Sequence, residues 1–193
     1  MFFGLVVLFF FFASIIRAQE KCEAPVLNVG DEWEYKTSLG KQLKQEVIKV
    51  EEDIYVLRFG GEVRGIDKKT MNYIFLIDES GRREKFTGTG SKILDFPLFV
   101  GKKTKNVKED FLEEYFIPAF EEIQTVAGTF KAFRIEYRQQ RWIRNRRPPY
   151  ETTLQASAEG TYWYAPEVKA IVKRTLKISK SMPDTELVAY KLN

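Results

Sequence analysis

Five arginines within ten residues, with a tryptophan among them, form the most distinctive chemical feature of the chain. This basic segment has no acidic residue and comprises Arg138, Arg141, Trp142, Arg144, Arg146 and Arg147. Arginine forks pair with phosphate or carboxylate groups, and an indole beside them can stack on a guanidinium. The segment therefore predicts contact with an anionic surface: lipid headgroups, lipopolysaccharide or an acidic envelope protein partner. The alternative interpretation is a solvated hairpin tip whose arginines keep the protein soluble.

A second candidate set is aromatic and comes from two distant parts of the chain. Its members are Trp33, Tyr35, Tyr162, Trp163 and Tyr164. Aromatic side chains commonly line apolar ligand pockets, so these residues are predicted to form walls of a site for a lipid or another hydrophobic small molecule. The alternative is ordinary packing in the core and at the sheet edge.

The chain lacks the residues that the most common catalytic mechanisms and metal sites require. The chain has no histidine and one cysteine, which excludes the usual Ser-His relays and ordinary zinc sites, and no phosphate-binding glycine motif is present. We therefore predict a non-enzymatic protein without a catalytic residue, metal or cofactor.

Two acidic clusters leave one enzymatic alternative, a carboxylate-based glycan hydrolase. The clusters are Asp31, Glu32 and Glu34, and Glu109, Asp110, Glu113 and Glu114. Such an enzyme needs two carboxylates about 5–10 Å apart in a cleft, and Trp33, Trp142 and Trp163 are candidate sugar platforms. The competing interpretation is the solvated face of alternating strands.

The first residues predict export. Residues 1–16 carry no charged side chain and are almost wholly apolar. This run is shorter than the roughly 20 residues of a spanning helix and fits a secretory signal peptide cleaved after Ala18. The predicted organisation is a signal peptide (1–18), a lead-in (19–29) and a single β domain (30–193), which is periplasmic or extracellular. Because no Lys or Arg precedes the apolar run, the alternative is an uncut membrane anchor over residues 1–16.

The single cysteine and the net charge limit other possibilities. Cys22 follows Glu20-Lys21 rather than small residues, so it does not fit a lipidation site, and we expect a free thiol on a disordered N-terminus. The alternative is a disulfide between two chains. A net charge of +4 is mild and predicts no nucleic-acid partner.

The stretch 125–178 must position both the basic segment and the second aromatic set. Lys131 to Gln140 alternates apolar and charged residues, a basic tip follows to Glu151, and the chain returns through Gly160 to Ile178. This pattern predicts one long antiparallel pair. Phe130 and Ala132 are out of phase with the later apolar positions, which indicates a bulge near Ala132.

Other strands follow from alternation and turn signals. Strands are expected over 31–36, over 42–50 and 54–59 as a hairpin, and over 186–192. Met71 to Asp78 is apolar on both faces and predicts a central strand, whereas Pro97 makes Ile93 to Val100 an edge strand or no strand. Lys108 to Phe116 fits either a short helix or a strand. The class is all-β: a single large curved antiparallel sheet or half-open barrel with at most one short helix, preceded by an apolar signal helix.

Four segments resemble a family of uncharacterised bacterial secreted proteins with a large, curved antiparallel sheet. They are Gly30 to Tyr35, Pro97 to Lys102, Ala127 to Phe130, and Tyr162 to Val168 leading to Val172-Lys173-Arg174. Together they span most of the mature chain in the family's order. The sequence departs at Thr104, close to where such proteins often have a tryptophan.

That family is similar in architecture to the half-barrel lipoprotein carriers of the bacterial envelope. In those carriers a curved sheet holds acyl chains against its concave face. The resemblance implies a fold and an envelope location, and it transfers no catalytic residue. Together with the two-faced apolar strand Met71 to Asp78 and the apolar faces of the 125–178 pair, it motivates the hypothesis of a hydrophobic or lipid-like ligand on the curved sheet.

Overall fold

The part of the chain that the structure describes folds mainly into antiparallel strands. The computed structural model describes residues 20–78, 80–85, 94–107, 111–144, 152–177 and 183–193, with no side-chain description for 144 and 152–154. Twelve of its strands form one sheet and two form a second, small sheet. This confirms the predicted all-β class. The predicted signal peptide and signal helix lie outside the described residues.

The large sheet consists of two meanders of six strands each. The first meander contains β2 (Glu32–Thr37), β3 (Gln42–Val50), β4 (Ile54–Phe59), β5 (Glu62–Asp67), β6 (Tyr73–Ile77) and β7 (Arg83–Lys85). The second contains β9 (Lys103–Val107), β10 (Phe111–Thr125), β11 (Gly128–Arg144), β12 (Thr152–Ala165), β13 (Ala170–Leu176) and β14 (Thr185–Lys191). The 3-10 turn Pro166–Val168 is the one helical turn among the described residues.

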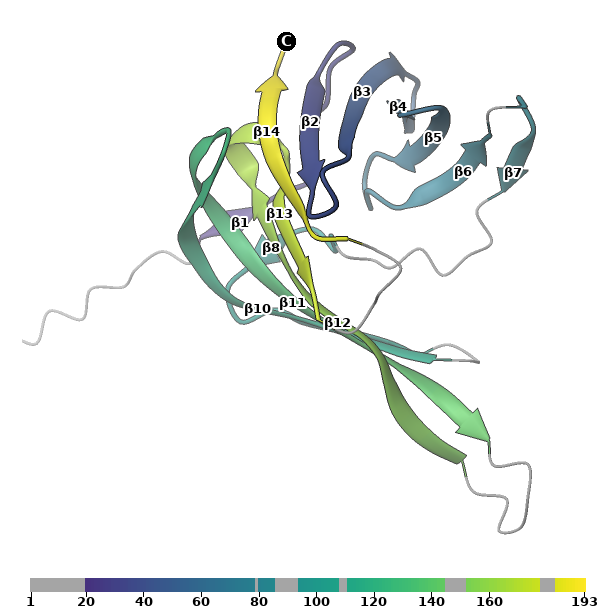
Figure 1. Ribbon diagram of the computed structural model, residues 1–193, viewed down its shortest axis with the longest axis vertical. Coiled ribbons are helices and arrows are strands. Elements are labelled where there is room, and N and C mark those ends of the chain that lie inside the picture. The colour runs from purple at the N-terminus through teal and green to yellow at the C-terminus, as the bar shows by residue number, and fades with distance from the viewer. Residues whose placement is uncertain (1–19, 79, 86–93, 108–110, 145–151, 178–182) are drawn as a thin grey trace, which may run out of the picture.

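The two meanders join because the last strand pairs with the first. β14 pairs antiparallel with β2, in a register that places Leu187 opposite Tyr35. The resulting strand order runs from β7 through β2 and β14 to β9, and the curled sheet does not close (Figure 1). The two edges, β7 and β9, are short and carry charged residues, which discourages pairing with another chain.

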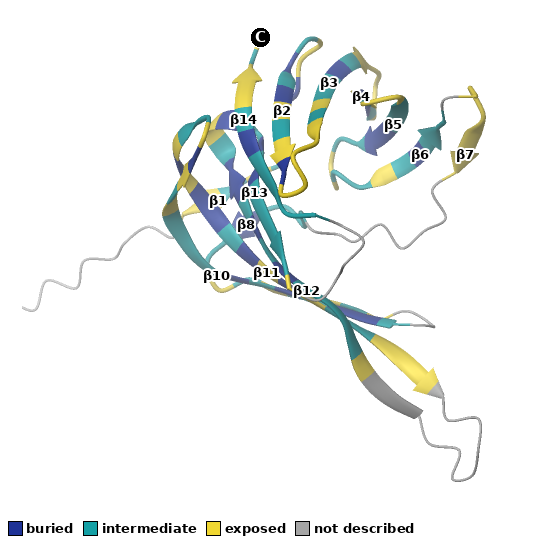
Figure 2. Ribbon diagram, viewed as in Figure 1, coloured by how far each residue is buried: buried dark blue, intermediate teal, exposed yellow. Residues whose placement is uncertain are grey.

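β11 contributes to two hydrophobic clusters on its opposite faces (Figure 2). Phe130 and Ala132 belong to a first cluster with Trp33, Leu57 and other residues of the first meander. Phe133, Ile135 and Tyr137 belong to a second cluster with residues of β10 and β12. Because successive side chains of a strand point to opposite faces, a strand buried on both sides loses simple alternation.

The predicted bulge near Ala132 is wrong, and the two-sided burial of β11 explains why. β11 pairs with β10 without interruption from Phe130 to Arg134, so no bulge occurs at Ala132. The irregularity lies across the ladder in β10, between Phe116 and Ala119. Phe130 and Ala132 are out of phase with the later apolar residues because they face the first cluster, whereas the later residues face the second. No extra residue in β11 is needed to explain the pattern.

The small sheet covers the second cluster. It pairs β1 (Lys21–Cys22) with β8 (Leu98–Phe99). Leu98 is 1% exposed, and Cys22 packs against the same cluster. The thiol therefore does not sit on a disordered N-terminus, contrary to the prediction, because this pairing holds the lead-in against β10–β12.

Two other predictions about strands need correction, and one open alternative is decided. The return segment 160–178 is two strands, because the turn Pro166–Val168 separates β12 from β13. Met71 to Asp78 is not central, since β6 is next to the edge strand β7 and Tyr73 is 38% exposed. The segment from Phe111 to Phe116 is strand, not helix, because it pairs with both β9 and β11, while 108–110 lie outside the described residues.

Candidate functional site

An apolar cavity of about 150 Å³ lies between the first meander and the start of β13. Its walls include Trp33 and Tyr35 from β2, Leu57 from β4, Ile66 from β5 and Ala170 from β13. The remaining lining residues are Leu27, Gln45, Met71, Asn72, Tyr73, Leu94, Lys169 and Ile171. A closed apolar cavity of roughly this volume accepts a ligand as large as benzene in another protein.

The two aromatic residues of β2 are held in place at this cavity. Trp33 is 2% exposed, and its indole Nε1 donates a hydrogen bond to the carbonyl oxygen of Val168 at 2.7 Å. Tyr35 is half-buried, and burial, reinforced by the neighbouring Tyr73, raises the pKa of its phenol. The structure therefore brings together two of the five aromatic residues predicted to bind a ligand.

The other three predicted aromatic residues lie elsewhere. Tyr162 and Tyr164 are buried in the second cluster, with Tyr164 packed edge-on against Phe96 at 5.4 Å between ring centroids. Trp163, between them, points to the opposite face and donates from Nε1 to Glu121 Oε1 at 3.0 Å. Alternation along β12 thus separates residues that are adjacent in sequence, and the cavity wall contains none of the three.

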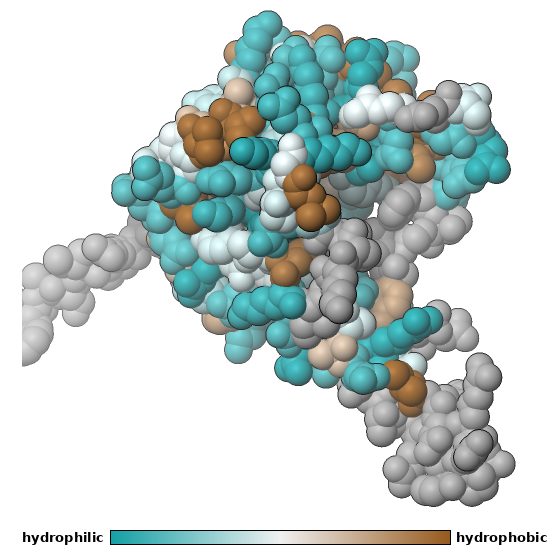
Figure 3. All heavy atoms as spheres, in the orientation of Figure 1, coloured by the Kyte–Doolittle hydropathy of each residue, from teal (hydrophilic) through white to brown (hydrophobic). Residues whose placement is uncertain are grey.

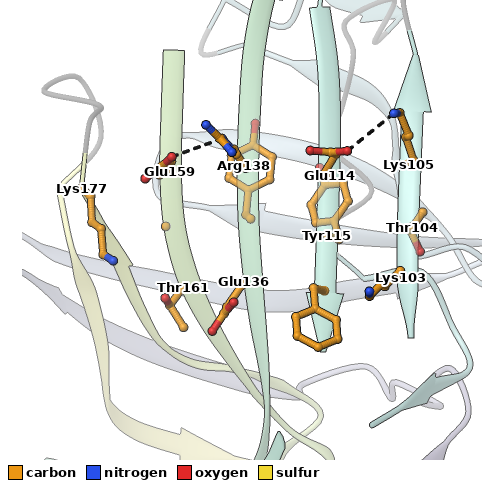
Figure 4. Close-up of a pocket in the computed structure, with 13 residues that line it drawn as sticks. Lys103, Thr104, Lys105, Glu114, Tyr115, Glu136, Arg138, Glu159, Thr161 and Lys177 are labelled. Carbon is orange, nitrogen blue, oxygen red and sulfur yellow. Dashed lines mark ion pairs between the residues drawn. The ribbon is translucent and has the colours of Figure 1, made fainter. Parts of the chain in front are cut away.

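A larger groove of about 640 Å³ crosses the second meander (Figure 4). This volume falls within the usual range of small-molecule sites. Its charged side chains lie on neighbouring strands and on the segment after β13: Lys103, Lys105, Glu114, Glu136, Arg138, Glu159 and Lys177. Charges of both signs therefore line the groove, in contrast to the apolar cavity.

Strand register arranges these charges in a row of alternating sign. Glu114 lies opposite Lys105 on one side and Arg138 on the other, and Arg138 lies opposite Glu159. Glu159 Oε1 is 3.3 Å from Arg138 Nε, and Glu114 Oε1 is 3.7 Å from Lys105 Nζ. Exposed ion pairs of this kind contribute about 0.2–1 kcal/mol each to the free energy of unfolding. Their main effect is therefore on the charge pattern of the groove rather than on the stability of the fold.

The groove bears on the hydrolase alternative. Three carboxylates, those of Glu114, Glu136 and Glu159, line it. A glycoside hydrolase requires one of its two carboxyl groups to be protonated. Each of the three lies in an ion pair: Glu114 with Lys105, Glu136 with Arg134 at 3.7 Å, and Glu159 with Arg138.

The acidic clusters found in the sequence do not meet. Asp31 is fully buried and pairs with Lys169, and Glu32 pairs with Lys44 at 2.7 Å. Glu113 is 1% exposed on the face opposite Glu114, and with burial it raises the pKa of Tyr137. Glu109 and Asp110 lie outside the described residues.

The basic segment is only partly described. Arg138 is committed to Glu159, whereas Arg141 is exposed and Trp142 is 38% exposed. Arg144 ends β11 without a side-chain description, and Arg146 and Arg147 lie outside the described residues.

Sequence reasoning missed the groove. Glu136 was recognised only as the polar side of a strand, and Glu159 and Lys105 were not singled out. The alternation of these charged residues with apolar neighbours shows which face of its own strand each one occupies. Their arrangement in one row depends on the register between four strands, which local sequence does not give.

The described residues contain no cluster of acidic, cysteine or histidine side chains able to hold a metal ion. No helix among them has the length and apolar character needed to cross a bilayer. The described part of the chain thus belongs to the class of large open antiparallel sheets, and it carries an apolar cavity and a charged groove.

Neither a comparison with protein-family models nor one with curated proteins gives a match. Two solved structures are similar: a predicted lipoprotein of Parabacteroides distasonis and a predicted exported protein with a YmcC-like fold from Bacteroides fragilis. Each is 14% identical, with 88% of this chain and 99% of the other covered and a TM-score of 0.44. Similarity this remote carries no inference about ligand, partner or location.

Proposed function

We propose that the protein is an exported, non-enzymatic binding protein that holds an apolar group of a hydrophobic or lipid-like ligand in the cavity beside Trp33. The observation that carries this proposal is the cavity itself: about 150 Å³, walled by Trp33, Tyr35, Leu57, Ile66 and Ala170. Removing apolar ligand surface from water supplies the affinity, at roughly 25 cal/mol per Å² before the costs of association.

The cavity size limits the ligand class. A volume of about 150 Å³ matches one aromatic ring or a short alkyl end rather than a complete acyl chain. Gln45 and Asn72 are polar lining residues and can fix the orientation of a polar group attached to that end. The ligand is thus amphipathic, with its apolar end inserted and the rest outside the cavity.

Two features support the non-enzymatic and exported parts of the proposal. The chain has no histidine, and each of the three groove carboxylates pairs with a cation. Residues 1–18 have the pattern of a secretory signal peptide. We place the apolar ligand in the smaller cavity rather than in the charged groove. A hydrocarbon in the groove would cover charged side chains, and removing charge from water is costly.

Native mass spectrometry of the protein purified from an exporting host is the first test. We expect an adduct of defined mass that organic solvent removes and that has apolar character. A protein that carries no adduct, and that also fails to bind the naphthylamine probe described next, would contradict the proposal.

A filling mutation locates the site. Ala170→Met adds side-chain volume to the cavity wall. We expect it to weaken binding of the fluorescent probe N-phenyl-1-naphthylamine, whose phenyl ring is the part that the cavity can hold, at least about tenfold, since the cavity loses most of its room. Ala189→Met adds the same side chain at an exposed position of β14 and serves as the control. Equal probe binding by both variants would place the ligand elsewhere.

A further inference from the structure

The end of β11 and the start of β12 project from the body of the sheet as a two-stranded ribbon (Figures 1 and 2). β10 pairs with β11 only up to the partners Phe111 and Arg141. Beyond that point the described partners of β11 are on β12 alone, with Trp142 opposite Leu154 and Ile143 opposite Thr153. An isolated two-stranded ribbon is only marginally stable in water, so this segment gains most from a partner.

The ribbon exposes large apolar side chains. Trp142 is 38% exposed and Ile143 is 42% exposed. Val107, at the end of the edge strand β9, is 68% exposed. Figure 3 shows hydrophobic residues at this projecting end, beside hydrophilic ones. Trp142 and Ile143 are consecutive strand residues, so they point to opposite faces of the ribbon.

An uncommitted cation accompanies these apolar residues. Arg138 pairs with Glu159 at 3.3 Å. Arg141 is exposed and forms no ion pair with any residue that the structure describes. The ribbon therefore offers positive charge and apolar surface together, and it offers the apolar surface on both faces.

We propose that this ribbon docks on a bilayer containing anionic phospholipid, with Trp142 and Ile143 at the boundary between headgroups and acyl chains and Arg141 at the phosphates. Tryptophan is enriched at this boundary, and arginine reaches headgroup oxygens while its stem covers apolar surface. Anionic headgroups complement the positive charge of Arg141.

The two-faced ribbon favours a bilayer over a protein partner. A protein surface covers one face of a ribbon and leaves either Trp142 or Ile143 in water, whereas the hydrated interface of a bilayer can contact both faces. At Trp142 and Ile143 the edges of the ribbon pair with no described strand besides each other. Hydrocarbon does not tolerate unpaired backbone groups, so we expect these residues to stay in the hydrated interface.

Vesicle sedimentation tests the proposal. The product of the full-length chain, with its N-terminus identified by mass spectrometry, is mixed with phosphatidylcholine vesicles with or without phosphatidylglycerol. We expect binding to the anionic vesicles that weakens as salt rises. Arg141→Gln should lower partitioning about fivefold, and Trp142→Ser roughly tenfold, because a large apolar contact is lost.

Two variants at the other end of the β10–β11 hairpin serve as matched controls. Lys131→Gln removes one exposed charge from the same strand, and Val126→Ser removes a side chain that is 71% exposed. Neither should change partitioning. Equal losses in the ribbon and control variants would overturn the proposal, because residues 1–18 or net charge would then explain the binding.

Three other outcomes also overturn it: no vesicle binding, equal binding to uncharged vesicles, and self-association that Trp142→Ser abolishes. The last outcome would assign the ribbon to a second copy of the chain. The variants lie outside the apolar cavity, so their effect on vesicles is independent of the proposed ligand site. Far-ultraviolet circular dichroism of each variant confirms that the fold is intact.

Discussion

Lys169 pairs with the fully buried Asp31, which is 138 residues earlier in the chain, at 3.1 Å between Nζ and Oδ2. The same carboxylate accepts hydrogen bonds from the backbone N–H of Asn28 at 2.9 Å and of Asn193 at 2.8 Å. One side chain thus connects the lead-in, the turn before β13 and the segment after the last strand. This connection fixes Trp33 and Ala170 relative to each other at the cavity.

Breaking this pair should destabilise the protein. We expect Asp31→Asn and Lys169→Met each to lower the free energy of unfolding by about 1–3 kcal/mol, because each leaves a buried polar group without its partner. The double variant should cost less than the sum of the two, since the second change removes a group that the first has already left unpaired. Urea unfolding of the four proteins measures this. Strictly additive losses would mean that the pair is not coupled.

A side chain at Gly65 should displace the ring of Phe75. A Cβ atom at Gly65 would lie 2.2 Å from Phe75 Cε1, far inside contact distance. We expect Gly65→Ala to cost about 1–3 kcal/mol from overpacking. Combining it with Phe75→Leu should recover part of that loss relative to the sum of the single variants. Thermal unfolding of the set decides the point, and a neutral Gly65→Ala would show that the ring moves freely.

Stability should fall steeply in alkali. Burial raises the pKa of Tyr35, Tyr137, Tyr162 and Tyr164 above the ordinary value of about 10. A raised pKa in the folded state means that the unfolded chain releases its protons first, so stability is full below about pH 10 and is lost as pH rises further.

The phenolate absorbance at 295 nm should therefore rise together with the loss of far-ultraviolet circular dichroism above pH 10. Phenolate formation by all tyrosines before any loss of structure would contradict the burial of these side chains.

The thiol of Cys22 should react slowly in the folded protein. Its Sγ donates to the carbonyl oxygen of Glu23 at 3.2 Å, and burial, with the charge of Glu23, raises its pKa. We expect its reaction with Ellman's reagent at pH 8 to be at least about tenfold slower than in urea, because the thiolate is the reactive form. Equal rates would mean that β1 is not held against β8.

Much of the first meander is readable from the sequence. The predicted strands 42–50 and 54–59 match β3 and β4, because clear alternation is bounded by Leu39-Gly40 and Gly60-Gly61. The strand β5 was not predicted, because Arg64 and Gly65 interrupt its apolar pattern. Gly65 is required there by the close approach of the Phe75 ring, a contact with another strand that local sequence does not encode.

The candidate site was only half predictable. Trp33 and Tyr35 were recognised because aromatic residues two apart on a strand share a face. Tyr162 to Tyr164 were grouped by sequence proximity, but the cavity wall contains none of them. The groove residues depend on register across four strands, and a shift of one residue would reverse every face.

By itself, the sequence determined the all-β class, the lack of histidine chemistry, the export pattern and the basic, aromatic character of the hairpin end. These follow from composition and from periodicities within single strands. Only the tertiary structure decided that β14 closes against β2, that β11 is buried on both faces, and that an apolar cavity and a charged groove form at separate places. Pairing between distant segments sets these features, because the contact energy of a sheet depends on which strands meet and in which register.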